Sequence, residues 1–306
     1  MAEKQLYDLV ILGGGPAGAT AALYGVRAGL SLVVLEKMMI GGEITSTDRL
    51  DNFPAFPEGI SGAEFGMLLH QQLENLKVPV HTVEIEQVSL SGDIKTVSTS
   101  AGEFEGKTVL IATGTEPNLL GAEGEQELVG RGVSYCATCD AAFFKDREVA
   151  VVGGGNAALE ETIFLDRFAS KIYLIHRRDQ LRGVKGLQDK VLSLPDVEVL
   201  WNTTVSKIEG DNKVRALQLK QDGEDRYLEI DGVFIYAGRT ASATFLAGQD
   251  IETAGNGFII TNEKMETSLA GVYAAGDIRQ KFLRQVITAA SDGAVAAIAA
   301  AQALFS

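Results

Sequence analysis

The sequence predicts an α/β fold of two similar βαβ domains, the second inserted into the first. Two apolar segments carry this prediction, at residues 6–12 and 148–152. Each runs directly into a glycine-rich turn, which begins at Gly13 in one case and at Gly153 in the other. Strands that alternate with helices in this way are typical of parallel sheets.

The order of elements also repeats after each turn. A helix-like stretch follows, and then a second apolar segment, at residues 31–35 and 171–175. A third apolar segment ends in glycine in each half, at residues 108–114 and 233–238. The chain therefore contains a degenerate internal repeat of one strand–helix–strand unit.

The end of the chain has no counterpart in the second half. Residues 257–260 and 271–277 predict two further strands, the latter running into a Gly-Asp turn. Residues 284–304 predict a helix of small side chains. This tail most simply completes the first domain.

The second domain is therefore expected as an insertion. The first domain comprises residues 1–117 and 245–306, and the second comprises residues 118–244. The stretches 116–121 and 240–248 are the expected two-stranded hinge.

Composition excludes several classes of function. The 27 basic and 41 acidic residues give a net charge of −14, which disfavours nucleic acid and anionic membranes as partners. A strand begins almost at once, which leaves no room for a signal peptide, and no apolar run approaches the ~18 residues that span a bilayer. With only two cysteines, a disulfide framework is impossible and a reducing cytoplasm is the expected compartment.

The first turn has the spacing Gly13-x-Gly15-x-x-Gly18. Such glycines permit a tight turn and let the backbone approach a pyrophosphate at the start of a helix. A lone loop of this kind can be a structural turn. Here Glu36 follows the next strand, where an acid accepts a ribose hydroxyl, and this context favours a bound dinucleotide.

The second turn, Gly153-x-Gly155-x-x-Ala158, is followed by a different signal. His176-Arg177-Arg178 ends the next strand, with Arg182 beyond it. Arginines there would bind a 2′-phosphate, whereas an acid would repel it. The alternative is a solvated basic patch. In an acidic chain, this position favours NADPH over NADH.

Both cysteines stand in one motif, Cys136-Ala137-Thr138-Cys139, followed by Asp140. Half of a zinc site is one alternative, but zinc takes four ligands and the chain has no second cysteine pair. A structural disulfide would close too small a loop to constrain the chain much. A redox-active pair is favoured. Asp140 could protonate a leaving thiolate, or it could be a helix cap or turn residue.

A weaker signal lies in the tail. Asp277 follows Gly276 at a strand end, where it could accept from a ribitol hydroxyl. A helix beginning near Arg284 would direct its positive end at a flavin carbonyl. A simple turn explains the same residues equally well.

Together these motifs resemble the low-molecular-weight thioredoxin reductases of bacteria and archaea, over nearly the whole chain. The segments GGGPAG, GVSYCATCDAAFF, VVGGGNAALEE and HRRDQLRGVK carry the resemblance. It implies a homodimeric enzyme with two Rossmann-like domains of the pyridine nucleotide-disulfide oxidoreductase class II type. Such enzymes carry electrons from NADPH through FAD to thioredoxin or a similar small dithiol protein.

The resemblance also implies residue roles. FAD is expected to be held by Gly13, Gly15, Pro16, Ala17, Gly18, Glu36, Gly42, Asn52, Thr113, Gly114, Gly276, Asp277, Arg284, Gln285 and Val286. NADPH is expected to be held by Gly153, Gly155, Asn156, Ala157, His176, Arg177, Arg178 and Arg182. Cys139 would face the flavin and form the transient adduct, Cys136 would attack the thioredoxin disulfide, and Asp140 would act as acid.

Only one of the two redox partners on the inserted domain can face the flavin at a time, so the resemblance implies a domain rotation. The chain departs from the family at Glu43, where Gln is usual, and at Ala157, where Ser is common. The stretch 238–242 lacks the usual Pro-Asn. None of these changes removes a motif.

Three other functions compete with this one. A ferredoxin-dependent reductase and a small-molecule dithiol oxidase share the fold but tend to lack the arginines. A non-catalytic NADPH sensor would not need Cys139. The sequence leaves open which thioredoxin is the partner.

Overall fold

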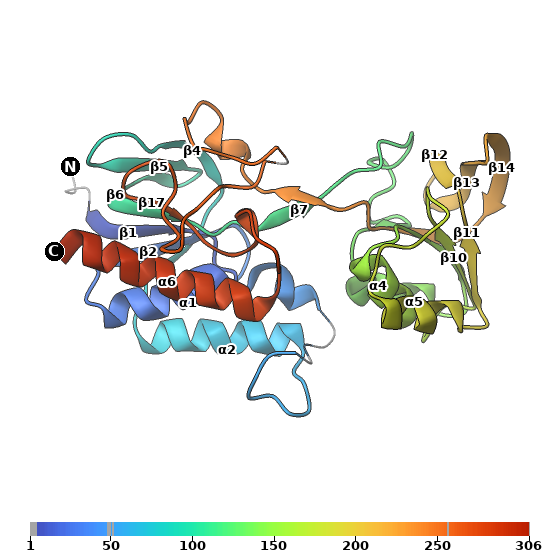
Figure 1. Cartoon of the computed structure of the whole chain (residues 1–306), viewed down its shortest axis with the longest axis horizontal. Coiled ribbons are helices and arrows are strands. Elements are labelled where there is room, and N and C mark those ends of the chain that lie inside the picture. Colours follow the sequence, from blue (N-terminus) through green and yellow to red (C-terminus); the bar gives the residue numbers. More distant parts are fainter. Residues whose placement is uncertain (1–4, 48–49, 51, 256, 306) are drawn as a thin grey trace. The chain divides into compact units, whose positions relative to one another are not determined.

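The computed structural model describes residues 5–47, 50, 52–255 and 257–305, but not the side chains of residues 138 and 139. The chain divides into two compact units, drawn in Figure 1. Unit 1 comprises Met1–Glu116 and Thr240–Ser306, and unit 2 comprises Pro117–Arg239.

Unit 1 is built on a parallel sheet of five strands. Their order is β3-β2-β1-β6-β17, and β5 and β4 add an antiparallel extension to β6. Strand β6 is long enough to pair with β5 near its start and with β17 near its end. The strands are β1 (Leu6–Leu12), β2 (Leu32–Glu36), β3 (Val80–Thr82), β4 (Ile85–Ser89), β5 (Lys95–Thr99), β6 (Gly102–Ile111) and β17 (Val272–Ala274).

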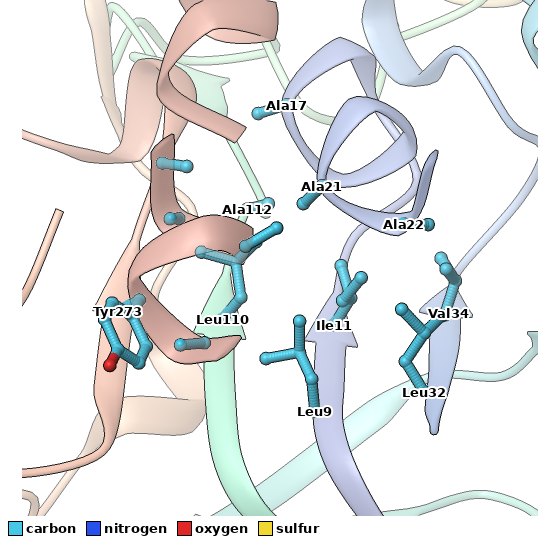
Figure 2. Close-up of a cluster of buried hydrophobic side chains, with 14 of the residues drawn as sticks. Leu9, Ile11, Ala17, Ala21, Ala22, Leu32, Val34, Leu110, Ala112 and Tyr273 are labelled. Carbon is cyan, nitrogen blue, oxygen red and sulfur yellow. The ribbon is translucent and has the colours of Figure 1, made fainter. Parts of the chain in front are cut away.

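Helices α1 (Pro16–Arg27) and α6 (Val286–Phe305) pack together against one face of this sheet. Figure 2 shows the core between them, where Leu9, Ile11 and Leu110 of the strands face the alanines of α1. A Cβ atom on Gly293 of α6 would collide with the carbonyl oxygen of Ala17, so the two helices touch through backbone. Helix α2 (Gly62–Asn75) is capped by the preceding residue, Ser61, whose hydroxyl accepts from the Glu64 amide.

Helix α6 is long and apolar enough to cross a membrane by length and composition alone. Its buried residues are mostly alanines, together with Gly293 and Asp292, and they form the face that meets α1. Core packing therefore accounts for the alanine-rich face of this helix, whereas the larger apolar side chains of Ile287, Val295, Ile298 and Phe305 are exposed.

One predicted strand is wrong. Residues 257–260 form no strand, and only Ile259 makes isolated bridges, to Thr253 and Arg279. Gly257 adopts a φ of +82°, which turns the chain directly before the apolar residues. Phe258 and Ile259 are buried by the core of unit 1, so their apolar character reflects burial within a loop.

Unit 2 repeats the parallel arrangement in the order β11-β10-β9-β15-β8. Helices α4 (Asn156–Leu165) and α5 (Lys185–Leu192) pack on each other beside it. The strands are β8 (Val133–Ser134), β9 (Glu148–Val152), β10 (Lys171–Ile175), β11 (Val197–Leu200) and β15 (Gly232–Ile235), with a separate antiparallel sheet of β12 (Thr203–Gly210), β13 (Val214–Gln221) and β14 (Glu224–Glu229). Because β1 and β9 each stand in the middle of matching strand orders, the internal repeat is real.

The chain passes between the units twice, and the two passages pair as strands. They are β7 (Thr115–Pro117) and β16 (Arg239–Ala241). The Asn118 amide donates to the Gly238 carbonyl at 2.9 Å, which extends the pairing by one bond. The expected hinge stretches overlap these strands, and a short 3₁₀ helix, η3 (Thr244–Leu246), follows the second.

Candidate active site

The first glycine loop connects β1 to α1 in unit 1. Gly13 has a φ of +100°, and a Cβ atom on it would lie 2.6 Å from the Ala112 carbonyl oxygen. A Cβ atom on Gly18 would collide with the Gly13 carbonyl oxygen. Around Gly15, by contrast, the nearest atom to such a Cβ is 3.9 Å away. Gly13 and Gly18 therefore close the turn. Gly15 leaves the N-terminal end of α1 open to a ligand.

Glu36 lies at the end of β2 and faces this loop. Its Oε2 accepts from the Gly14 amide at 2.6 Å, and its Oε1 accepts from the Met38 amide at 2.9 Å. The carboxylate is thus fixed beside the glycines, where a ribose hydroxyl can also donate to it. This geometry fits the adenosine half of a bound dinucleotide.

Residues far apart in the sequence meet near the start of α6. The Asn52 amide donates to Gln285 Oε1 at 2.8 Å. The Arg284 guanidinium lies 4.0 Å from the centroid of the Phe258 ring and donates to the carbonyl oxygens of Asp277 and Arg279 at 3.4 and 3.3 Å. Several residues chosen from the sequence therefore meet on one side of unit 1. They are Asn52, Asp277 in the Gly-Asp turn, and Arg284 and Gln285 before α6.

Three further residues of unit 1 were chosen from the sequence for FAD. Thr113 donates to the Ser242 carbonyl oxygen at 2.7 Å, which ties the end of β6 to the returning chain. Gly114 and Gly42 have φ values of +70° and +58°, so both occupy the left-handed region that favours glycine. Helix α6 begins at Val286, two residues later than expected from sequence.

The second glycine loop connects β9 to α4 in unit 2. A Cβ atom on Gly153 would lie 2.7 Å from Ala158 Cβ, whereas one on Gly155 would meet no atom within 4 Å. Asn156 begins α4, and its Oδ1 accepts from the Val184 amide at 2.8 Å. The exposed Ala157 follows it. The second glycine loop is therefore open at its middle glycine, Gly155, as the first loop is at Gly15.

His176 lies beneath the second loop, and its ring packs so closely on Gly154 that a Cβ there would collide with it. The side chain is 4 % exposed, and burial lowers its pKa below the ordinary value. Within the described part of the chain, its Nε2 atom is buried without a hydrogen-bond partner. A ligand group that accepts or donates there would satisfy it.

Three arginines surround this histidine. Arg177, Arg178 and Arg182 are exposed, and no ion pair among the described residues occupies their guanidinium groups. The Arg182 backbone is fixed because its amide donates to the Gly154 carbonyl oxygen at 2.6 Å. Free guanidinium groups beside a glycine loop fit a phosphate, which they bind through charge-assisted hydrogen bonds.

The cysteine motif lies in unit 2 at α3 (Ala137–Asp140), directly after β8. Cys136 is disulfide-bonded. The side chain of Cys139 lies outside the described residues. Asp140 precedes a 3₁₀ helix, η2 (Ala141–Phe144), but its side chain makes no capping hydrogen bond to it. The cap interpretation of Asp140 therefore has no contact to support it.

A model of the pyridine nucleotide-disulphide oxidoreductase family matches residues 7–293. The chain belongs to this family. It is 42% identical over 297 residues to a thioredoxin reductase of Listeria innocua, covering 96% of this chain and 92% of the relative.

Solved structures agree with this assignment to the oxidoreductase family. A thioredoxin reductase of Lactococcus lactis has a TM-score of 0.91 and 38% identity, covering 97% of this chain and 98% of that one. A second, from T. acidophilum, has a TM-score of 0.90 and 30% identity, covering 99% and 100%. The predicted fold class and the resemblance to thioredoxin reductases are confirmed.

The structure of this oxidoreductase also shows contacts that sequence reasoning missed. Asp292 is 7 % exposed inside α6, and it accepts from Lys281 Nζ at 2.7 Å, from Arg279 at 3.1 Å and from the Gly276 amide at 3.1 Å. This network holds the whole turn that contains Asp277. No local motif marks it, because the acid lies in a run of small residues more than ten positions away.

Similar contacts hold the cysteine segment. Glu125 is 1 % exposed and accepts from the Tyr135 hydroxyl at 2.7 Å and from the amides of Leu120 and Gly121 at 3.0 and 2.8 Å. The chain entering unit 2 is thereby tied to the residue before Cys136. Among the residues that the structure describes, no cluster of histidine, cysteine or acidic side chains could hold a metal ion.

Proposed function

We propose that this chain is a thioredoxin reductase that carries electrons from NADPH through FAD and the Cys136/Cys139 pair to the disulfide of thioredoxin. The observation that carries the proposal is a disulfide-bonded Cys136 in the same unit as the second nucleotide loop. The family match and the similarity to thioredoxin reductases over almost the full chain support the activity and its cofactors, FAD and NADPH.

We assign FAD to unit 1, as the FAD-binding domain. The loop of Gly13, Gly15 and Gly18 would hold the pyrophosphate, with Glu36 on the ribose. Asn52, Asp277 and the start of α6 would hold the flavin half. When bound, FAD supplies the two-electron step between the nicotinamide and the cysteines.

We assign NADPH to unit 2, the NADPH-binding domain that also carries the cysteines. Gly155 and Asn156 would hold the pyrophosphate, while His176 and the three arginines would hold the 2′-phosphate. The unoccupied guanidinium groups support this assignment over a ferredoxin-dependent reductase or a dithiol oxidase, whose donors offer no such phosphate. They equally support NADPH over NADH.

The reduced cysteines would then exchange with thioredoxin. The Cys136 thiolate attacks one sulfur of the partner's disulfide, and a mixed disulfide forms as the partner's own sulfur–sulfur bond breaks. Asp140 would protonate the leaving thiolate. Cys139 then attacks Cys136, which restores the disulfide in the enzyme and releases the second partner thiol.

Three features come from the resemblance and belong to this proposal. The enzyme would act as a homodimer in the cytoplasm. The inserted domain would rotate about β7 and β16, so that the cysteines and the nicotinamide reach the flavin in turn. A covalent cross-link that fixes the two units should stop turnover, and turnover at the uncrosslinked rate would refute the rotation.

The activity is tested with the purified yellow protein. NADPH oxidation should depend on added thioredoxin, drawn from a panel of thioredoxins, and should be much faster than NADH oxidation. A protein that fails to oxidise NADPH with every thioredoxin offered would reject the proposal. A Cys139→Ser variant with unchanged function would favour the non-catalytic sensor.

A further inference from the structure

We propose that Ser134 and Tyr236 are positioning residues that keep the Cys136/Cys139 pair strongly reducing by holding the first two backbone amides of the redox turn. The inference rests on the proposed function, in which this pair donates electrons. Ser134 lies in the segment that carries the cysteines, and Tyr236 lies in the third apolar segment of unit 2, but neither was chosen from the sequence as a site residue.

Ser134 holds the Cys136 peptide from within β8. Its Oγ accepts from the Cys136 amide at 3.0 Å and lies 3.2 Å from the Cys136 carbonyl oxygen, to which it donates. The side chain is 5 % exposed. Because it lies in a strand paired with β15, its position is fixed by the sheet.

Tyr236 holds the next amide from the other direction. Its hydroxyl oxygen accepts from the Ala137 amide at 2.8 Å. Tyr236 directly follows β15, and its own amide donates to the Val152 carbonyl oxygen at 2.8 Å. Burial raises the pKa of the Tyr236 hydroxyl, so the group that accepts from the Ala137 amide is the neutral hydroxyl over the working pH range.

The charges around this hydroxyl favour the neutral form as well. Glu161 of α4 and Asp140 of α3 oppose its ionisation, whereas the Ala137 amide and Arg239 favour it. The hydroxyl thus lies among two acids and one base.

The consequence concerns the couple in which the disulfide gains two electrons and two protons and becomes two thiols. Backbone amides that point at a sulfur stabilise its thiolate, and a stabilised reduced form makes a pair more oxidising. In this enzyme the amides of Cys136 and Ala137 are already bound to hydroxyl oxygens. These two amides are therefore not available to donate to a cysteine thiolate. The reduced form of the pair gains no stabilisation from them and remains a good electron donor.

The test measures the reduction potential of the cysteines in the holoenzyme. Wild type, Tyr236→Phe and Ser134→Ala are equilibrated in dithiothreitol buffers of graded potential, and the thiols are then counted by alkylation. Because the chain has only two cysteines, the count reports this pair alone. We expect each variant to become more oxidising by about tenfold in the equilibrium constant, or about 30 mV for two electrons.

A matched control is Tyr173→Phe. Tyr173 is 8 % exposed in the same sheet, and its hydroxyl donates to Glu148 at 3.0 Å, away from the cysteines. It should lose stability without a shift in potential. If one test variant yields no holoenzyme, the other decides. Potentials equal to that of the control, or more reducing than wild type, overturn the inference.

The outcome is independent of the proposed function. Thiol counting needs neither NADPH nor thioredoxin. A shifted potential in a protein that cannot reduce thioredoxin would reject the function alone. Normal thioredoxin reduction with unshifted potentials would reject the role of Ser134 and Tyr236 alone.

Discussion

At the scale of residues, the second nucleotide site is defined by charges that no ion pair among the described residues neutralises. His176 is buried, its Nε2 has no hydrogen-bond partner in the part of the chain that the structure describes, and exposed arginines follow it. In an acidic chain, unpaired arginines beside a glycine loop are best explained by an anionic ligand.

Replacing Arg177 or Arg178 with alanine tests this charge. The KM for NADPH should rise at least about tenfold for each, because a hydrogen bond to a charged group contributes ~1.5–3 kcal/mol. The KM for NADH should stay unchanged. Arg215→Ala is the control, since Arg215 is exposed in the same unit and pairs with Glu209. Equal losses for both nucleotides would contradict a 2′-phosphate site.

His176 offers a second test at this scale. Its pKa is lowered, chiefly by burial, so the folded protein resists protonating it. Its ring resonances in NMR spectra should therefore titrate below about pH 6.5, the ordinary value. The contribution to stability is full above that value and is lost as the pH falls toward the folded pKa. A His176→Gln spectrum assigns the signal, and titration above pH 6.5 would refute its burial.

The sequence revealed the residues whose roles depend on local spacing. The glycine loops, Glu36 and the cysteine pair each lie within a motif. The roles of Ser134, Tyr236 and Asp292 could not be read from local spacing, because strand order or helix packing fixes their contacts. Such contacts depend on which strands become neighbours, and a single sequence does not state that order.

At the scale of elements, α1 and α6 form the most closely packed pair in unit 1, and Gly293 permits it. Gly293→Ala would force a Cβ into the Ala17 carbonyl oxygen and should destabilise the fold by about 1–3 kcal/mol. FAD should also be retained less well, since α1 carries the first glycine loop. Thermal unfolding and the flavin content after gel filtration measure both effects.

The control is another helical glycine. Gly186 lies in α5, where an added Cβ would meet no atom within 4 Å. Gly186→Ala should therefore stabilise its helix by up to ~1 kcal/mol. If Gly293→Ala behaved like this control, the close contact between α1 and α6 would be wrong.

Element prediction succeeded for strands of the two repeated strand–helix–strand units. The segments 6–12, 148–152 and 171–175 match β1, β9 and β10 in full. It failed at residues 257–260, where buried apolar residues in a loop looked like a strand. Apolar runs report burial, and only pairing with a neighbour makes a strand.

At the scale of the whole molecule, the inserted unit is one continuous segment with its own core. Residues 117–239 expressed alone should therefore fold and bind NADPH without FAD. Isothermal titration with NADPH checks this, and an Arg178→Ala version of the fragment is the control for specific binding. A fragment that folds yet binds no NADPH would contradict the assignment of the two cofactors to separate units.

The central claim is that electrons leave the enzyme only through the cysteine pair. The most direct measurement adds NADPH and oxidised thioredoxin to wild type and to Cys136→Ser, and follows both flavin bleaching and thioredoxin thiols. We expect bleaching in both proteins, with thioredoxin thiols formed only by wild type. Thioredoxin thiols formed by Cys136→Ser at the wild-type rate would contradict the account.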